Sequence, residues 1–311
     1  MSRVLVTVAI PALNEAVNIG RCIASIRQHV PPRLDFEILV GDHGSSDGTP
    51  AIAAKEGAKV LAFRGGTVGE LRNRIVAASK GSILVFLDAD TTVTPEWGAG
   101  LAGAIESLQA DPKQFTGSMC SEPDSDGPFV RFWSARLPRE EPSYLGTGHM
   151  IVPATLFREL RGFTPGLRSG EDYDFCMRAK AAGATLVVRP ELRVLHHDYP
   201  RTAMAFIRRE RWHGSGDFQS IGRVLSSKVA LAALLFLALQ IGALVALIFS
   251  LRAFLALEGV AALLVIAFSF LKFRGLGLGA RLANIGIFYL YLIGRCLSAT
   301  ALVRRSARTG H

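Results

Sequence analysis

Short apolar runs alternate with amphipathic stretches through the first 90 residues. The runs suit strands that are buried on both faces, and the stretches between them repeat apolar positions at helical spacing. We expect Asn14 to cap the first helix and Val17 to lie on its buried side. The pattern predicts strands at 4–10, 36–40, 59–63 and 84–87, and helices at 17–29, 50–56 and 67–79. This order predicts parallel strands with right-handed crossovers, a half-sheet of the nucleotide-binding type.

Further elements follow residue 90. Helices are predicted at 95–110 and 154–160 and from residue 171 onward, and strands at 150–152 and 185–188. Between them, residues 117–148 are rich in Gly, Ser and Pro and contain Phe129, Phe132 and Trp133. Loops on the carboxyl side of such sheets often carry substrate specificity. Two interpretations stay open: a substrate-binding loop, or a surface loop whose aromatic side chains fill the core.

The C-terminal part of the chain has a different pattern. Residues 229–251 contain no charge, and 23 residues suffice to cross a hydrocarbon core of about 30 Å. Further apolar segments cover 253–271, with Glu258, and 282–303, with Arg295. Because ionisable groups are costly in hydrocarbon, we predict that Glu258 and Arg295 pair. The predicted organisation is an α/β domain at 1–200, a basic amphipathic hinge at 201–228, two to three transmembrane helices at 229–303, and a basic tail at 304–311.

The charge distribution indicates which kinds of partner the chain binds and how it is oriented in the membrane. The 311 residues carry a net charge of +9, which favours an anionic membrane surface or a phosphate-bearing substrate over nucleic acid. Four scattered cysteines without C-x-x-C spacing suggest reduced thiols. The positive-inside bias predicts an integral membrane protein with a cytoplasmic N-terminal domain. Three spans would leave Arg304, Arg305 and Arg308 outside, so the number of spans stays open.

Polar residues follow each strand of the predicted half-sheet. Leu84–Leu87 leads directly into Asp88-Ala89-Asp90, and the carboxyl ends of parallel strands meet at one edge of a sheet. Carboxylate oxygens suit Mg²⁺ or Mn²⁺ and, through the metal, a diphosphate. The alternative is an Asp-rich turn in which Asp90 caps a helix.

Five motifs together resemble the family 2 glycosyltransferases. They are Ile10-Pro-Ala-Leu-Asn-Glu15, Asp42-His-Gly-Ser-Ser-Asp-Gly-Thr49, Leu71-Arg-Asn73, Phe86-Leu-Asp-Ala-Asp90 and Gly170-Glu-Asp172. The resemblance covers residues 4–200 and implies the GT-A fold, a mixed α/β sheet with helices on both faces. Position 43 departs from the family, which often has Asp or Asn there; the position varies within it.

The resemblance also implies roles for individual residues. Pro11, Glu15 and Asp42 would line a nucleoside pocket, Asp88 would lie near the ribose, and Asp90 would bind the divalent cation. Arg72 would approach the base or the phosphates, with a solvated helix charge as the alternative. Asp47 is expected to be a turn or cap residue.

An acidic pair begins the helix that starts at residue 171. A helix N-terminus favours ionised carboxylates, so Glu171 and Asp172 could be a purely structural first turn. In the family, this pair stands where a base accepts the acceptor hydroxyl's proton, and we assign that role to Asp172, with Glu171 either supporting it or contacting the acceptor. His196 could complete the metal ligands or be structural.

The basic hinge contains a second, weaker resemblance. Arg208-Arg209-Glu210-Arg211-Trp212 is similar to the Gln-x-x-Arg-Trp motif of processive polysaccharide synthases, with Arg208 in place of Gln. Arg211 and Trp212 would then contact the acceptor or the diphosphate. The alternative is an amphipathic helix on anionic headgroups.

The predicted function is sugar transfer from a nucleotide-sugar donor to a lipid or lipid-linked acceptor at the cytosolic membrane face, with inversion of the anomeric centre. The alternatives are a processive polysaccharide synthase and a non-catalytic membrane scaffold that retains the fold. A nucleotidyltransferase on a related fold is a further class.

Overall fold

The chain folds into two compact units. In the computed structural model, residues 4–122, 127, 129–134 and 142–300 are described. The first unit comprises Met1–Pro123 and Glu140–Asp198, and the second comprises Asp124–Arg139 and Tyr199–His311. The short segment that enters the second unit therefore interrupts the first unit in sequence.

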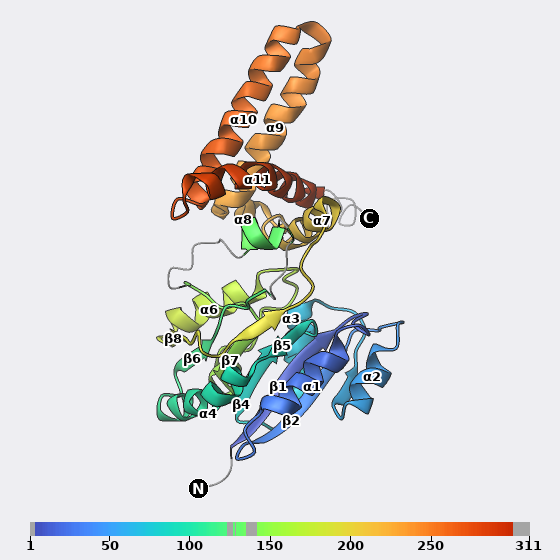
Figure 1. The fold of residues 1–311 in the computed structure, drawn as a ribbon, viewed down its shortest axis with the longest axis vertical. Helices are drawn as coiled ribbons and strands as arrows, with labels where there is room; N and C mark the ends of the chain where they lie inside the picture. Colours follow the sequence, from blue (N-terminus) through green and yellow to red (C-terminus); the bar gives the residue numbers. More distant parts are fainter. Residues whose placement is uncertain (1–3, 123–126, 128, 135–141, 301–311) are drawn as a thin grey trace. The chain divides into compact units, whose positions relative to one another are not determined.

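The first unit is built on a seven-stranded mixed sheet (Figure 1). In sheet order the strands are β3 (Lys59–Ala62), β2 (Asp35–Asp42), β1 (Leu5–Ala12), β4 (Ile83–Leu87), β7 (His149–Pro153), β6 (Gln114–Gly117) and β8 (Thr185–Val188). The first four are parallel, as the alternation of runs predicts. β7 then runs antiparallel to β4 and to β6, and β6 is parallel to β8.

Helices cover both faces of this sheet, so its central strands are buried on both sides. Along β4, Val85 and Leu87 belong to one hydrophobic core, and Leu84 and Phe86 belong to the other. The helices are α1 (Ile19–His29), α2 (Thr49–Lys55), α3 (Val68–Ala77), α4 (Pro95–Ala110), α5 (Ala154–Glu159) and α6 (Glu171–Ala181). α1, α2 and α4 contribute to the first core, and α3, α5 and α6 to the second. The expected α/β fold class is confirmed.

Two short strands form a separate sheet that the sequence pattern did not predict. β5 (Thr91–Val93) pairs antiparallel with β9 (Val194–His196), so Thr91 lies opposite His196. Each strand has only three residues, too few for a periodic pattern to be recognised. This pairing joins the end of the Asp88–Asp90 turn to a segment about 100 residues away.

Two details at the end of β1 differ from expectation. The strand continues through Pro11 to Ala12, beyond Ala9, its last residue paired with β4. Asn14 does not cap α1: it has a left-handed backbone (φ 56°), and the N-cap position is Asn18. Val17 precedes the helix and is 88% exposed, so its expected place on the buried side is wrong.

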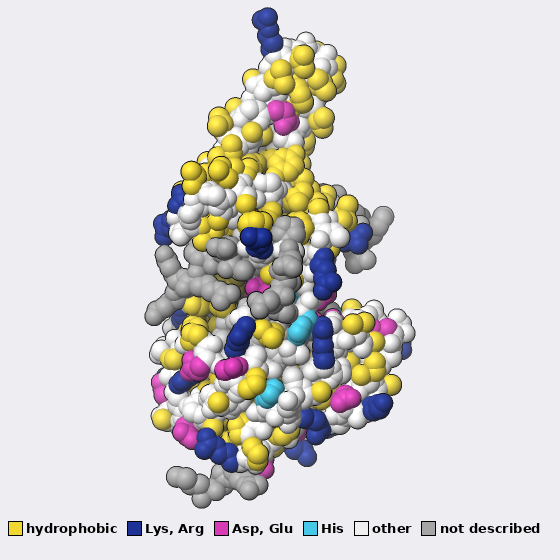
Figure 2. All heavy atoms as spheres, viewed as in Figure 1, with side chains coloured by type: hydrophobic (Ala, Val, Ile, Leu, Met, Phe, Trp, Pro, Cys, Tyr) yellow, Lys and Arg dark blue, Asp and Glu magenta, His cyan; other side chains and the backbone are white. Residues whose placement is uncertain are grey.

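The second unit is helical. Its elements are η1 (Phe129–Ser134), α7 (Ala203–Gly214), α8 (Ile221–Ser226), α9 (Lys228–Phe249), α10 (Leu251–Lys272) and α11 (Leu278–Ser298). α9, α10 and α11 are each long and apolar enough to cross a membrane. Many exposed side chains of α9 and α10 are hydrophobic, and they gather on the face of this pair that Figure 2 shows. The aromatic residues Phe129 and Trp133 pack in this unit's core, which favours the core-filling interpretation of their segment.

Candidate active site

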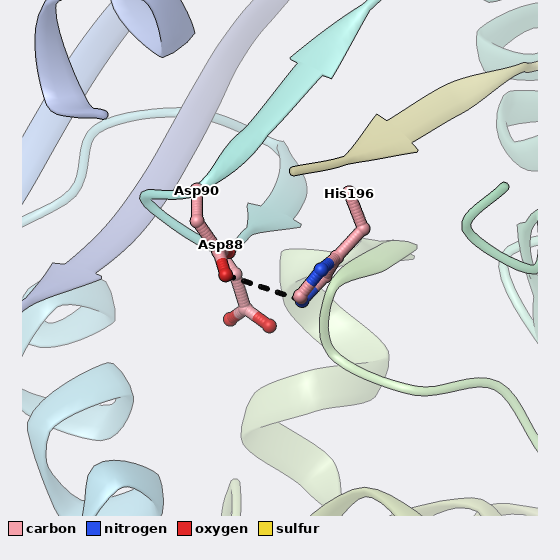
Figure 3. Close-up of side chains that lie close together, drawn as sticks. All are labelled: Asp88, Asp90 and His196. Carbon is pink, nitrogen blue, oxygen red and sulfur yellow. Dashed lines mark ion pairs between the residues drawn. The ribbon is translucent and has the colours of Figure 1, made fainter. Parts of the chain in front are cut away.

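Asp88 and Asp90 follow β4 at the carboxyl edge of the parallel strands. The Asp88 carbonyl accepts hydrogen bonds from the backbone N–H and the hydroxyl of Thr91, which closes the turn and starts β5. Because β5 pairs with β9, the imidazole of His196 meets this turn (Figure 3). Its Nε2 lies 3.3 Å from Oδ2 of Asp90. One ligand atom from each of Asp88, Asp90 and His196 lies within 4.8 Å of the others.

These three side chains suit a divalent cation. Two carboxylates and one imidazole are donors that Mn²⁺ accepts readily, and Mg²⁺ also prefers the carboxylates. Burial, with the neighbouring charges of Asp88 and Glu15, raises the pKa of Asp90 to about 8. Without a cation the Asp90 carboxyl therefore keeps its proton up to about pH 8, and a bound cation would displace this proton and compensate the carboxylate charge. The alternative in which Asp90 caps a helix is wrong, because Thr94 caps α4.

Arg72 connects this cluster to the acidic pair on α6. Its Nη2 donates to Oδ1 of Asp88 at 2.5 Å, and its Nη1 donates to Oε1 of Glu171 at 2.8 Å. The side chain is 3% exposed, so the interpretation of Arg72 as a solvated helix charge is wrong. A Cβ on Gly69 would stand 3.3 Å from the Glu171 side chain, so the absence of one lets the two helix starts approach closely.

Glu171 and Asp172 form the first turn of α6, after Gly170 with its left-handed backbone (φ 77°). Glu171 is 4% exposed and is held by Arg72. Oδ1 of Asp172 accepts a hydrogen bond from the backbone N–H of Tyr173. Burial, and then the charge of Glu171, raises the pKa of Asp172 to about 6, although Arg72 lowers it in part. At neutral pH this carboxylate is still mostly ionised and is a stronger base than an exposed aspartate.

The loops after β1 and β2 are joined by hydrogen bonds. Asp47 accepts from the N–H of Ala16 and from Thr49, which confirms it as a turn residue. Oδ1 of Asn14 accepts from the N–H of Ser46. These bonds fix the position of Glu15, whose own N–H donates to Thr49 Oγ1.

Glu15 and Asp42 lie at this same edge of the sheet. Burial raises the pKa of Glu15, and the charges of Asp198 and Asp88 raise it further. The Glu15 carboxylate therefore lies close enough to the Asp88–Asp90 turn to interact with it electrostatically. Asp42 pairs in register with Ala12 at the ends of β2 and β1, next to the buried Pro11. Its Oδ2 accepts from the N–H groups of Gly44 and Ser45. Asp42 therefore shapes its own loop, and its predicted nucleoside contact stays a prediction, as does that of Pro11.

Two family models match the chain. The model described as "Glycosyl transferase family 2" matches residues 7–146, which contain the Asp88–Asp90 turn and Arg72. The model described as "Glycosyl transferase family group 2" matches residues 129–272 and extends into the apolar helices. The chain belongs to the family 2 glycosyltransferases.

Curated relatives of this glycosyltransferase chain cover it in part. Glycosyltransferase AglE of Haloferax volcanii is 28% identical over 198 residues, 58% of this chain and 63% of the relative. The pre-mycofactocin glycosyltransferase of Mycobacterium tuberculosis is 26% identical over 227 residues, 67% of this chain and 46% of the relative. The succinoglycan biosynthesis protein ExoO of Rhizobium meliloti is 28% identical, with 62% and 60% covered. The chain thus spans about half to 63% of the length of these relatives.

Two solved structures share the fold of this family 2 chain. The mannosyltransferase PcManGT from Pyrobaculum calidifontis, solved with GDP-Man and Mn²⁺, has a TM-score of 0.61 at 21% identity, with 96% of this chain and 88% of that one covered. S. aureus TarS, residues 1–349 with UDP-GlcNAc, has a TM-score of 0.54 at 16% identity, with 98% and 92% covered. These likenesses confirm the expected GT-A fold.

Sequence reasoning missed two parts of this family 2 site. It did not assign Asp88 to the metal cluster, and it gave no role to Asp198, whose charge raises the pKa of Asp90. The available signal was the acidic residue two positions after His196. Arg211 and Trp212 lie on α7 in the second unit, where Arg211 is exposed and Trp212 is 50% exposed. Their contact with an acceptor stays a prediction.

Proposed function

We propose that this chain is an inverting, metal-dependent glycosyltransferase that moves a sugar from a nucleotide-sugar donor to a lipid or lipid-linked acceptor at the cytosolic membrane face. The observation that supports it best is the continuous arrangement from the Asp88–Asp90–His196 cluster through Arg72 to the Glu171–Asp172 pair. A purely structural site would have little reason to gather so many carboxylates around one arginine.

Asp88, Asp90 and His196 would hold the divalent cation. When bound, the cation would neutralise the charge that develops on the leaving nucleoside diphosphate. Arg72 keeps Asp88 oriented toward this site through its 2.5 Å ion pair. Glu15 and Asp42, at the ends of the neighbouring strands, would contact the nucleoside.

Asp172 would act as the base. The acceptor hydroxyl oxygen attacks the anomeric carbon, its proton passes to the Asp172 carboxylate, and the bond between that carbon and the diphosphate oxygen breaks. The nucleoside diphosphate leaves with the bonding electrons, and the single displacement inverts the anomeric centre. Glu171, paired with Arg72, would hold the start of α6 in place, and its remaining negative charge would support the basicity of Asp172.

The membrane-compatible helices support a lipid acceptor. A basic hinge that leads directly into α9 would bring anionic headgroups, or a phosphate-bearing lipid, to the enzyme. The same basic residues support a cytosolic first unit.

The test is transfer of labelled sugar into lipid extracts. The purified full chain is incubated with Mn²⁺, membrane lipids and a panel of UDP- and GDP-sugars, and labelled lipid product is measured. We expect one donor to give metal-dependent product that Asp172→Asn abolishes. Asp174→Asn, on the same helix and paired with Arg178, is the matched control and should retain activity. If none of the donors gives turnover, the result would support the non-catalytic scaffold. A ladder of products of increasing length would support a processive synthase.

A further inference from the structure

Helix α11 presents a topological question because its length and composition would allow it to cross the bilayer. The side on which each part of α11 lies can be read from its contacts with segments whose side is set by chain connectivity. A segment that precedes the first span, or that is linked to the first unit by fewer than about 20 residues, must lie on the side of the first unit.

The start of α11 lies on that side. α9 begins at Lys228, and only the short helices α7 and α8 lie between it and the first unit. α9 and α10 are joined at Ser250 and pack against each other as a hairpin (Figure 1). α10 therefore returns to the side from which α9 left, and α11 starts at Leu278, shortly after α10 ends at Lys272.

The middle of α11 is held by η1. The ring centroid of Trp133 lies 5.0 Å from that of Tyr291 and 6.1 Å from that of Phe288. η1 lies between β6 and β7 of the first unit, and each connection is shorter than a helical span of about 20 residues requires. Tyr291 and Phe288 therefore lie on the side of the first unit as well.

The end of α11 is held by α7 and the segment after it. Nη2 of Arg295 lies 3.1 Å from Oε2 of Glu210, and Nη1 lies 3.5 Å from Oδ2 of Asp217. The expected pairing of Arg295 with Glu258 is wrong, because the partners of Arg295 precede the first span. Ser298 Oγ donates to the Arg211 carbonyl at 2.8 Å.

Small residues allow α11 and α7 to approach this closely. A Cβ on Gly294 would stand 2.8 Å from Cβ of Glu210 and 3.0 Å from the Ile207 carbonyl. A Cβ on Gly214 would meet the hydroxyl of Ser298. The two helices are thus packed as one layer, and α7, with its run of arginines, belongs at a membrane surface.

We propose that α11 is an interfacial helix bound to the leaflet nearest the first unit, and that the chain crosses the membrane only twice, through α9 and α10. The exposed face of α11 carries Leu282, Tyr289 and Leu297, which would contact lipid and continue the apolar surface of the hairpin. The basic tail with Arg304, Arg305 and Arg308 lies outside the described residues, and with two spans the sequence order would put it on the same side as the basic hinge. This removes the conflict with the positive-inside bias that three spans create.

Cysteine labelling in cells tests this directly. In full-length chain with the four native cysteines replaced, single cysteines are introduced as Arg33→Cys in the first unit, Arg252→Cys near the start of α10, and Thr300→Cys after α11. A membrane-impermeant maleimide is applied before and after permeabilisation. We expect Thr300→Cys and Arg33→Cys to be labelled under the same one of these two conditions. Arg252→Cys should be labelled under the other. Labelling of Thr300→Cys together with Arg252→Cys would overturn the proposal.

A second readout removes the dependence on cysteine replacement. Reporter pairs that are active on only one side of the membrane, fused after His311 and after Arg252 in otherwise unaltered chain, should report opposite sides. Reports of the same side would overturn the proposal. Neither measurement depends on transferase activity, so its outcome is distinct from that of the proposed function.

Discussion

Buried charges are arranged differently in the two units. In the first unit, burial raises the pKa values of Glu15, Asp90 and Asp172, and the charge of Asp88 raises each of them further, while Arg72 compensates only part of this charge. In the second unit, Glu210 and Asp217 meet Arg295, and Lys272 Nζ lies 4.5 Å from the Trp133 ring centroid.

This difference distinguishes a ligand-binding site from a cluster of charges with a structural role. Charges that are buried without full compensation destabilise the protein and are tolerated where a ligand completes them. Charges that are buried with matched partners fix one arrangement of the surrounding helices. The comparison therefore predicts that removing a buried carboxylate stabilises the folded protein in the first unit and destabilises it in the second.

The largest effect is expected for Asp172→Asn. Loss of the base should reduce kcat by about 10²- to 10⁴-fold. Because the folded pKa of about 6 lies above the ordinary value of 3.8, ionised Asp172 costs stability above pH 6, and its neutral replacement should stabilise the chain at pH 8 by about 2–3 kcal/mol. Activity and thermal unfolding of the purified protein check both. An inactive but destabilised variant would contradict the assignment of an uncompensated charge.

Glu210→Gln, in contrast to Asp172→Asn, should destabilise the folded protein. It leaves Arg295, whose side chain is 14% exposed, without its closest carboxylate, at a cost of about 3 kcal/mol. Thermal unfolding in detergent measures this, and the double variant Glu210→Leu/Arg295→Leu should recover much of the loss. Glu191→Gln, from an exposed pair with Arg189, is the matched control and should change little. Equal losses at Glu210 and Glu191 would contradict a structural role for the buried pair.

The pH profile of the parent enzyme gives the next effect. Below the Asp172 pKa of about 6 the base is protonated, so kcat should fall about tenfold per pH unit toward acid and level off above pH 7. Initial rates at saturating donor and metal check this. A rate independent of pH between 5 and 7 would exclude Asp172 as the base.

Arg72→Gln should shift that profile by a smaller amount. Arg72 lowers the pKa of Asp172, so its loss should move the acid limb to higher pH by roughly half a unit to one unit. Arg72→Lys keeps the charge and should restore part of the shift. A variant that loses activity equally at every pH would show that Arg72 does not act through this carboxylate.

The parallel half of the fold was predictable because its strands are buried on both faces and stand out as apolar runs. Beyond this half, α4 and β8 also begin and end at the residues that the sequence pattern predicts. β5 and β9 were not predictable, because three-residue strands carry no periodic signal and their pairing spans about 100 residues. His196 was therefore a candidate ligand whose partner strand was unknown.

The acidic motifs named residues that the structure brings together at one edge of the sheet, but they did not show how these residues are connected. The Leu71–Asn73 motif named Arg72, but the sequence alone is compatible with an exposed side chain on α3. The close approach of α3 to α6 buries Arg72 and pairs it with Glu171. Arg295 was paired with the wrong carboxylate, because hydropathy alone treats α11 as a span. Its true partner, Glu210, lies in a polar run that periodicity assigns to a membrane surface.

Binding of Mn²⁺ tests the central claim most directly, namely that Asp88, Asp90 and His196 form the cation site of the first unit. Titration of the purified full chain with Mn²⁺ by electron paramagnetic resonance should show one site whose affinity rises with pH up to about 8, as Asp90 loses its proton. Asp90→Asn should weaken binding by more than about 100-fold, and Asp174→Asn should not change it. Equal binding by the parent and Asp90→Asn would contradict the account.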